Sequence, residues 1–279
     1  MSDEAGNAFA GHRPSKRLGQ NFLHNPSIID RIIKEFAPQA NETIVEIGPG
    51  KGALTTELIA RAGRVIAVEF DNNLAPALRE KFSESPNFEL LHADALVTDF
   101  CLAIQPATRA RLVANLPYNI STAILQHLIA QRSCLDETVV MLQKEVVDRI
   151  QAPAGSSERG YLSVLIEAYC EIEKLFDVAP GSFRPQPKVW SSVVRLKFRP
   201  ELSTKVGSEE LLWSVVSAGF MQKRKTILNN LRNASGKLQE VIKQNGGASI
   251  VLCKAGVDLQ RRAETLSVEE WGQITRAME

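Results

Sequence analysis

Residues 43–58, TIVEIGPGKGALTTEL, join a short apolar run to a helical pattern through a glycine-rich turn. Gly48, Gly50 and Ala53 match the nucleotide-binding pattern G-x-G-x-x-G/A, and Glu69 follows about 20 residues later, where that pattern expects an acid. Glycines let a backbone approach a ligand closely, and a carboxylate after the second strand accepts hydrogen bonds from ribose hydroxyls. The segment predicts a Rossmann-like sheet that binds a nucleoside-containing cofactor.

Strand and helix patterns alternate on both sides of this turn. Apolar runs typical of buried strands occupy 64–70, 88–94, 111–116 and 138–143, and helical spacing occupies 28–36, 74–82, 121–131 and 161–170. Such alternation predicts a mostly parallel α/β sheet with both faces covered. The runs at 173–180 and 191–200, joined by the proline-rich FRPQPK, predict an antiparallel hairpin at one edge. Ser27 is the expected cap of the first helix.

The character of the chain changes after residue 200. The segment 201–210, ELSTKVGSEE, is a polar connector, and only helical patterns follow it. The last of them begins with Ser267 and Glu270 in the spacing of a capping box. We therefore expect two domains, an α/β domain over 1–204 and a small all-α domain over 205–279.

Composition restricts the class of protein more than its function. The 279 residues are 44% hydrophobic and carry a net charge of +1, as in ordinary globular proteins. No apolar run approaches the roughly 20 residues that cross a bilayer, so no membrane contact is expected. The four cysteines lie far apart, without a C-x-x-C pair, which predicts neither disulfides nor a metal site and favours a reducing cytoplasm. No stretch indicates a dimer interface, so a monomer is expected.

Positive charge is concentrated in two segments. Residues 221–243 hold six basic residues against the single acid Glu240; they are Lys223, Arg224, Lys225, Arg232, Lys237 and Lys243. A second cluster near the start contains Arg13, Lys16 and Arg17. Two concentrated basic segments in a nearly neutral chain suggest contact with a polyanion. For either cluster alone, a solvated helix face is the simpler interpretation.

Two further strand ends distinguish between cofactors. Asp94 ends the third strand, where it can hold an adenine amino group or simply cap the next helix, and NLPY at 115–118 ends the fourth. An NAD-dependent dehydrogenase fits the glycine turn but has no use for NLPY. S-adenosylmethionine, which has an adenosine and no pyrophosphate, accounts for the whole set better.

NLPY suits methyl transfer to an exocyclic amine. Positive charge builds on the attacking nitrogen, and acceptors placed there stabilise it. The side-chain carbonyl of Asn115 and the main-chain carbonyl of Leu116 are two such acceptors, and Pro117 restricts Leu116 to extended conformations. Tyr118 can stack on a flipped base, which offsets part of the few kcal/mol that flipping costs.

Taken in order, the motifs resemble the small-subunit (16S) ribosomal RNA adenine N6,N6-dimethyltransferase family. The resemblance runs from KRLGQNFL (16–23) through EIGPGKGALT, VIAVEFD, HADAL, NLPYNIS and FRPQPKVWSSVVRL to FMQKRKTILNNL (220–231), nearly the whole chain. Trp190 departs from it, since a small acidic residue is more usual there. The family implies a class I methyltransferase fold, dimethylation of two adjacent adenosines in a hairpin loop near the 3′ end of the RNA, and a role in small-subunit biogenesis.

The same resemblance implies cofactor contacts at Asn21, Leu23, Gly48, Glu69, Asp94 and Asn115. Phe183 either closes the far side of the base or belongs to the core of the late hairpin. Lys223, Arg224 and Lys225, with the N-terminal cluster, are expected to hold RNA phosphates. Two alternatives stay open: a methyltransferase of large-subunit RNA, and a ribosome-assembly factor in which methylation is secondary.

Overall fold

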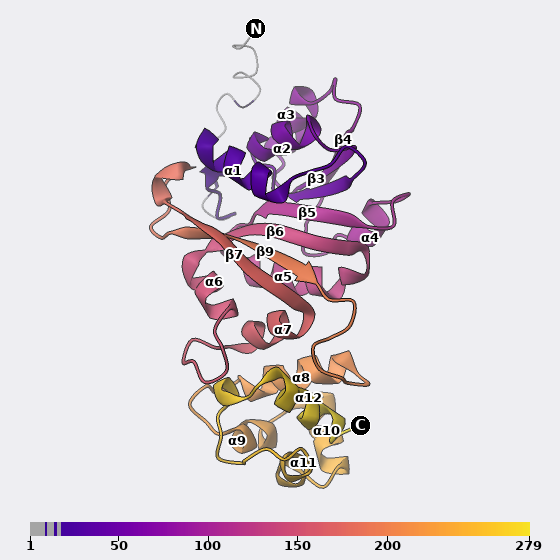
Figure 1. The fold of residues 1–279 in the computed structure, drawn as a ribbon, viewed down its shortest axis with the longest axis vertical. Helices are drawn as coiled ribbons and strands as arrows, with labels where there is room; N and C mark the ends of the chain where they lie inside the picture. Colours follow the sequence, from indigo (N-terminus) through magenta and orange to yellow (C-terminus); the bar gives the residue numbers. More distant parts are fainter. Residues whose placement is uncertain (1–8, 10–13, 16–17) are drawn as a thin grey trace. The chain divides into compact units, whose positions relative to one another are not determined.

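The computed structural model describes residues 9, 14, 15 and 18–279, which divide into two compact units (Figure 1). The first comprises Met1–Val147 and Glu173–Phe198, and the second comprises Asp148–Ile172 and Arg199–Glu279. This division differs from the expected single boundary at residue 205, because α7 (Tyr161–Tyr169) packs with α8 (Glu209–Gly219) and α12 (Val268–Arg276). The indole nitrogen of Trp213 donates to the Tyr169 hydroxyl over 2.7 Å within that helical unit.

A seven-stranded sheet forms the centre of the first unit, in the order β4-β3-β2-β5-β6-β9-β7. Five neighbouring strands pair in parallel, β9 runs antiparallel to β6, and β7 lies at the edge beside β9. The predicted mostly parallel sheet with late strands added at one edge is confirmed. The strands are β2 (Thr43–Ile47), β3 (Arg64–Glu69), β4 (Phe88–His92), β5 (Ala110–Asn115), β6 (Leu135–Gln143), β7 (Cys170–Val178) and β9 (Ser191–Phe198).

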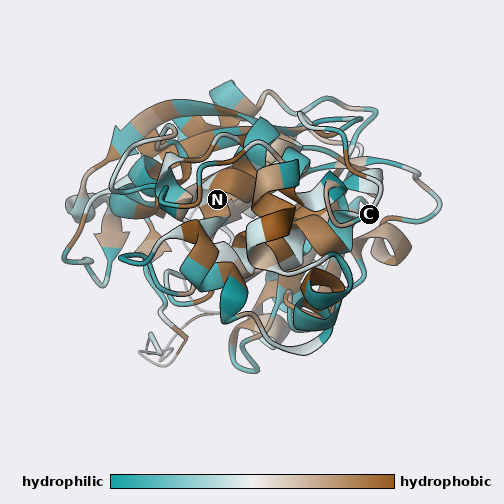
Figure 2. Cartoon of the chain, turned by 90° about the horizontal axis from the view of Figure 1, so that it is seen from below, coloured by the Kyte–Doolittle hydropathy of each residue, from teal (hydrophilic) through white to brown (hydrophobic). Residues whose placement is uncertain are grey.

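Helices follow the strands. They are α1 (Pro26–Phe36), α2 (Ala53–Ile59), α3 (Leu74–Lys81), α4 (Phe100–Ala103), α5 (Ser121–Ala130) and α6 (Lys144–Ile150). Of these, α1, α2, α3 and α5 lie where the apolar spacing predicts them, and α4 and α6 are not predicted. The cap of α1 is Asn25, whose Oδ1 accepts from the Ser27 amide at 3.1 Å, so the expectation of a Ser27 cap is wrong. In Figure 2 many helices carry both hydrophobic and hydrophilic residues, as helices with one buried side do.

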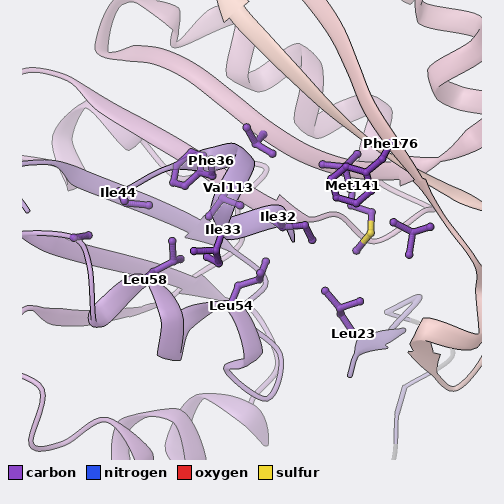
Figure 3. Close-up of a cluster of buried hydrophobic side chains, with 14 of the residues drawn as sticks. Leu23, Ile32, Ile33, Phe36, Ile44, Leu54, Leu58, Val113, Met141 and Phe176 are labelled. Carbon is purple, nitrogen blue, oxygen red and sulfur yellow. The ribbon is translucent and has the colours of Figure 1, made fainter. Parts of the chain in front are cut away.

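One apolar cluster joins α1 and α2 to one face of the sheet (Figure 3). Phe36 and Leu58 are fully buried there against Ile44 of β2 and Val113 of β5. Leu23 belongs to the same cluster. The apolar residues of these strands therefore fix the sheet from which the polar strand ends project.

A two-stranded sheet pairs the N-terminal segment with the proline-rich connection. β1 (Phe22–Leu23) runs antiparallel to β8 (Phe183–Arg184), with Leu23 opposite Phe183. The His24 amide extends this pairing by donating to the Ser182 carbonyl at 3.0 Å. From the sequence, the segment GQNFLHNP (19–26) is interpreted as a loop, because a two-residue strand is too short to show the alternation of apolar and polar residues.

Cys101 and Cys134 form a disulfide, contrary to the expectation from their wide spacing. They lie 33 residues apart, yet α4 and the short helix Arg132–Cys134 bring their Cα atoms to 5.4 Å. Gln131 contributes to this approach, since its side chain accepts from the Phe100 amide at 2.5 Å and donates to the Thr98 carbonyl at 2.9 Å.

The helical unit is built around Trp271, which is fully buried. Its described α-helices beyond residue 199 are α8, α9 (Ile227–Arg232), α10 (Gly236–Gln244), α11 (Ala248–Lys254) and α12, and a short 3-10 helix, Ala263–Thr265, precedes α12. The predicted capping box of α12 is present: Ser267 Oγ accepts from the Glu270 amide, and the Glu270 carboxylate accepts from the Ser267 amide. Among the described residues, no helix is long and apolar enough to span a membrane.

Candidate active site

A cavity of about 200 Å³ opens at the carboxyl ends of β2, β3, β4 and β5. In a doubly wound sheet this is the edge where ligands bind. Segment 18–22, before and within β1, forms a further wall. Most of the predicted site residues line this cavity, namely Asn21, Gly48, Gly50, Glu69, Asp94, Asn115, Leu116 and Pro117.

The glycine turn needs glycine at both predicted positions. Gly48 and Gly50 have φ values of +66° and +60°, in the left-handed region that other residues rarely adopt. A Cβ on Gly50 would lie 2.9 Å from Cδ1 of Phe22, so the turn and segment 18–22 meet without room for a side chain. The turn therefore presents backbone to the cavity.

Glu69 ends β3 with its carboxylate buried beside the turn. The Gly50 amide donates to Oε2 at 3.3 Å, and the Asp71 amide donates to Oε1 at 2.8 Å. Burial raises the pKa of Glu69, while these two hydrogen bonds act to lower it. A carboxylate fixed at the end of the second parallel strand is suited to accept from ribose hydroxyls.

A second buried acid, Glu46, lies in β2 directly before the turn. Burial raises its pKa to about 7, although the Thr55 hydroxyl donates to Oε2 at 2.6 Å and lowers it. Glu69 raises the Glu46 pKa further through charge repulsion. The sequence reasoning did not single out Glu46, yet an acid inside the apolar strand TIVEI is a visible signal.

Asp94 lines the cavity and also shapes its own loop. Oδ1 accepts from the Leu96 amide at 2.9 Å, and the main-chain carbonyl accepts from the Val97 and Thr98 amides. The bond to Leu96 closes a turn and caps no helix. The next helix, α4, is capped by Asp99, whose Oδ1 accepts from the Leu102 amide at 2.9 Å, so the capping role that the sequence left open for Asp94 is wrong. Asp94 stays on the cavity wall, in a position to contact a base.

Asn115 is the last residue of β5 and is held from the opposite wall. Its Nδ2 donates to the Asn21 carbonyl at 3.0 Å, which leaves Oδ1 as the acceptor of the side chain. The Leu116 amide donates to the Met141 carbonyl at 3.2 Å, so the following residue is fixed to β6. The residues that carry the two expected acceptors at the end of β5 are therefore both held in place by hydrogen bonds.

Tyr118 and Phe183 do not line the cavity, and neither does Leu23. The Tyr118 hydroxyl lies 2.7 Å from Ser191 Oγ at the start of β9, and burial raises the Tyr118 pKa. Phe183 is only 2% exposed and packs in the apolar cluster with Leu23. The structure thus places Phe183 in the hairpin core, the second of its two expected roles.

Segment 18–22 is fastened to the cavity by contacts of residues that the residue patterns alone did not identify. Gln20 Nε2 donates to Asp71 Oδ2 at 2.6 Å, next to Glu69. Asn21 accepts from Asn115, and Phe22 abuts Gly50. Asn21 came from the family resemblance alone, and Gln20 carries no signal other than its place in the same motif.

Lys223, Arg224 and Lys225 lie in the helical unit, in the turn between α8 and α9. All three are exposed, and none forms an ion pair with the residues that the structure describes. Arg13, Lys16 and Arg17, the second predicted basic cluster, fall outside the described residues. Within the described ranges no group of three or more His, Cys, Asp or Glu could hold a metal ion.

Comparison with known proteins gives a consistent family. The family described as "Ribosomal RNA adenine dimethylase" matches residues 11–276. "Ribosomal RNA small subunit methyltransferase A" of Hahella chejuensis is 46% identical over 222 residues, 80% of this chain and 81% of that protein. The protein of the same name from Nitrosococcus oceani is 43% identical over 95% of this chain and 96% of its own.

Two solved structures have similar folds. A dimethyladenosine transferase from Plasmodium falciparum aligns with a TM-score of 0.74 and 24% identity, over 91% of this chain and 95% of that chain. The 23S rRNA methyltransferase ErmE aligns with a TM-score of 0.65 and 27% identity, over 92% and 99%. Both confirm the class I methyltransferase fold that the sequence predicts.

Proposed function

The chain belongs to the ribosomal RNA adenine dimethylase family, and from this premise we propose that it dimethylates N6 of two adjacent adenosines near the 3′ end of small-subunit ribosomal RNA. Its general activity is adenine dimethylation of ribosomal RNA. The observation that supports this proposal most strongly is the hydrogen bond between Asn115 and Asn21, because it orients Asn115 Oδ1 as an acceptor. Asn115 ends β5 and Asp94 follows β4, which in sheet order are the last and first of the four strands that border the cavity.

We further propose that the cavity holds S-adenosylmethionine, which supplies an electrophilic methyl group when bound. The donor set fits: glycine backbone at Gly48 and Gly50, the buried carboxylate of Glu69 for hydroxyls, and Asp94 for the adenine side. The left-handed φ values of Gly48 and Gly50 let the turn present backbone to the cavity, as close approach of a ligand requires. Asn21 completes this wall through its carbonyl.

Methyl transfer to the adenine amine requires no strong general base from the protein. The adenine amine gains positive charge as it attacks, and Asn115 Oδ1 and the Leu116 carbonyl are placed to stabilise that charge. Pro117 restricts Leu116 and so directs its carbonyl. Tyr118 stacks on the flipped base, with its hydroxyl held by Ser191.

The helical unit is proposed to bind RNA through Lys223, Arg224 and Lys225, which have no acidic partner among the described residues. Phosphate contacts of this kind supply affinity that does not depend on sequence. We propose that the enzyme acts as a monomer on the small subunit or its precursor in the cytoplasm. This location rests on the ribosomal substrate, because the Cys101–Cys134 disulfide removes the argument from the cysteines. The small-subunit relatives are 43–46% identical, against 27% for ErmE, which favours small-subunit RNA over large-subunit RNA.

Labelled S-adenosylmethionine tests the proposal directly. Undermethylated small subunits should acquire dimethyladenosine at two adjacent positions, while large subunits serve as the competing substrate. Asn115→Ala should remove the transfer. Label mapped to large-subunit RNA, or wild-type rates in Asn115→Ala, would overturn the substrate or the catalytic assignment respectively. Normal subunit maturation with a folded, inactive variant would instead support the assembly-factor alternative.

A further inference from the structure

Trp190 is an exposed aromatic ring on a fixed backbone. It is 52% exposed, and the preceding Val189 is 37% exposed. The Trp190 carbonyl accepts from the Lys144 amide at 2.9 Å, and the next residue, Ser191, begins β9 opposite Gln143 of β6. Burial of so large an apolar surface is favourable, so a rigidly mounted ring left in solvent suggests an occupant for that surface.

The position of Trp190 is linked to the catalytic motif. Ser191 is fully buried, and its hydroxyl lies 2.7 Å from the Tyr118 hydroxyl. Consecutive Cα atoms are about 3.8 Å apart, so Trp190 is one residue from the group that holds Tyr118. β9 runs antiparallel to β6, which places the start of β9 at the same edge of the sheet as the end of β5. The backbone of Trp190 therefore adjoins the residue that holds the Tyr118 hydroxyl, at the sheet edge where NLPY ends β5.

The charges around the ring favour a nucleic acid over a protein partner. Arg184 and Lys188 in the same connection are exposed and form no ion pair with the described residues. The nearby carboxylate of Asp177 is already engaged by Lys144 and Lys174 at 2.9 and 2.7 Å. An exposed indole and unpaired cations in one connection are the combination that binds single-stranded nucleic acid, through base stacking and phosphate contact.

We propose that Trp190 is a stacking site for a nucleobase next to the target adenosine, with Arg184 and Lys188 contacting the adjoining phosphates. This inference rests on the proposed RNA substrate. It assigns recognition of the flanking nucleotide to a part of the chain outside the cofactor cavity. The flanking base would be held while Tyr118 receives the target base.

Two variants separate stacking from packing. Trp190→Phe keeps an aromatic face, and Trp190→Ala removes it. Stacking on an aromatic residue is worth about 1–3 kcal/mol per base, so the alanine variant should raise KM for the RNA about 5- to 150-fold with little change in kcat. The phenylalanine variant should recover most of that loss. Equal KM in all three proteins would overturn the proposal.

Fluorescence gives a readout that does not depend on methylation. The chain has three tryptophans, of which Trp271 is fully buried and Trp213 bonds to Tyr169. A short single-stranded oligoribonucleotide should quench the wild-type emission and that of the matched control Trp213→Phe, but not that of Trp190→Phe. Quenching that persists in Trp190→Phe would contradict the assignment.

The same two measurements distinguish failure of this inference from failure of the proposed function. If quenching depends on Trp190 but the protein methylates no small-subunit RNA, the stacking site is supported and the proposed substrate is wrong. A weaker effect of Trp190→Ala on oligoribonucleotide binding than on binding to intact subunits would identify a ribosomal protein as the partner of the ring and overturn the proposal.

Discussion

The side-chain amide of Asn115 donates to the main-chain carbonyl of Asn21 over 3.0 Å, across 94 positions of sequence. This bond joins the end of β5 to the segment that enters β1. The wall proposed to hold the cofactor and the side chain proposed to face the substrate are therefore joined by a hydrogen bond. Changes at Asn115 should affect binding and chemistry by separable routes.

Comparison of Asn115→Ala with Asn115→Asp separates the two routes. Both variants lose the donor to Asn21, so both should weaken S-adenosylmethionine binding, by up to about tenfold for one lost hydrogen bond. Only alanine also removes the acceptor for the amine, and loss of one such group costs about 100-fold or more in kcat. Calorimetry and single-turnover methyl transfer measure the two effects. Equal kcat values in the two variants would show that the acceptor is not what matters.

The contact between Gly50 and Phe22 predicts a coupled pair. Gly50→Ala places a Cβ 2.9 Å from the Phe22 ring and requires a left-handed φ, so cofactor binding should weaken strongly. Phe22→Ala makes room for that Cβ but leaves the backbone strain. The double variant should therefore bind S-adenosylmethionine better than the sum of the two single effects predicts, as calorimetry can measure. Strict additivity would mean that the ring and the turn do not meet in solution.

The fold could be predicted from the sequence because the spacing of the apolar residues and the order of the strands indicate the same sheet. Buried parallel strands and amphipathic helices leave different apolar spacings, and parallel order brings Gly48, Glu69, Asp94 and Asn115 to one edge. Each of these residues follows or ends a strand, so its place in the cavity follows from the sheet alone. Asn21 has no such pattern, and it reaches the cavity only through contacts with residues far along the chain.

The features that the sequence did not predict have the same physical origin, because each depends on tertiary contacts. The two-residue strand Phe22–Leu23 exists only because it pairs with Phe183–Arg184, and the same pairing places Phe183 opposite Leu23 in the apolar cluster, away from the cavity. The spacing of α7 shows an apolar helix but not which core receives it. Cys101 and Cys134 meet because two short helical turns pack together, which their separation of 33 residues does not indicate.

Substitution of Lys223, Arg224 and Lys225 together by alanine should weaken RNA binding in a salt-dependent way. Each lost phosphate contact reduces the slope of log K against log salt by about 0.7–0.9, so three contacts reduce it by about 2–3. Lys34, Lys197 and Lys205 are also exposed and unpaired within the described ranges, and their triple alanine variant has the same change in charge. Filter binding from low to moderate salt compares the two. An identical slope in both would assign the loss to net charge rather than to this turn, and S-adenosylmethionine affinity should stay unchanged in each.

Glu46 should make the stability of the first unit fall as the pH rises. Burial raises its pKa from 4.5 in the unfolded chain to about 7 in the fold. The protonated form is therefore favoured by folding, and its contribution is fully present below pH 4.5 and is lost as the pH rises through 7. The loss amounts to about 3 kcal/mol at most. Glu46→Gln keeps an acceptor for Thr55 and removes the titration.

Thermal unfolding from about pH 4.5 to about pH 8.5 measures this effect as the Tm of Glu46→Gln minus the Tm of the wild type. The new amide of the variant adds a constant offset, so the sign of the difference at one pH decides nothing. The difference should instead increase as the pH rises toward 7 and level off above it, because only the wild type loses stability over that range. Glu80→Gln, at an exposed position of α3, makes the same change in charge and should give a flat difference. A flat difference for Glu46→Gln as well would mean that Glu46 is ionised throughout and that the buried carboxylate has a compensating partner in solution.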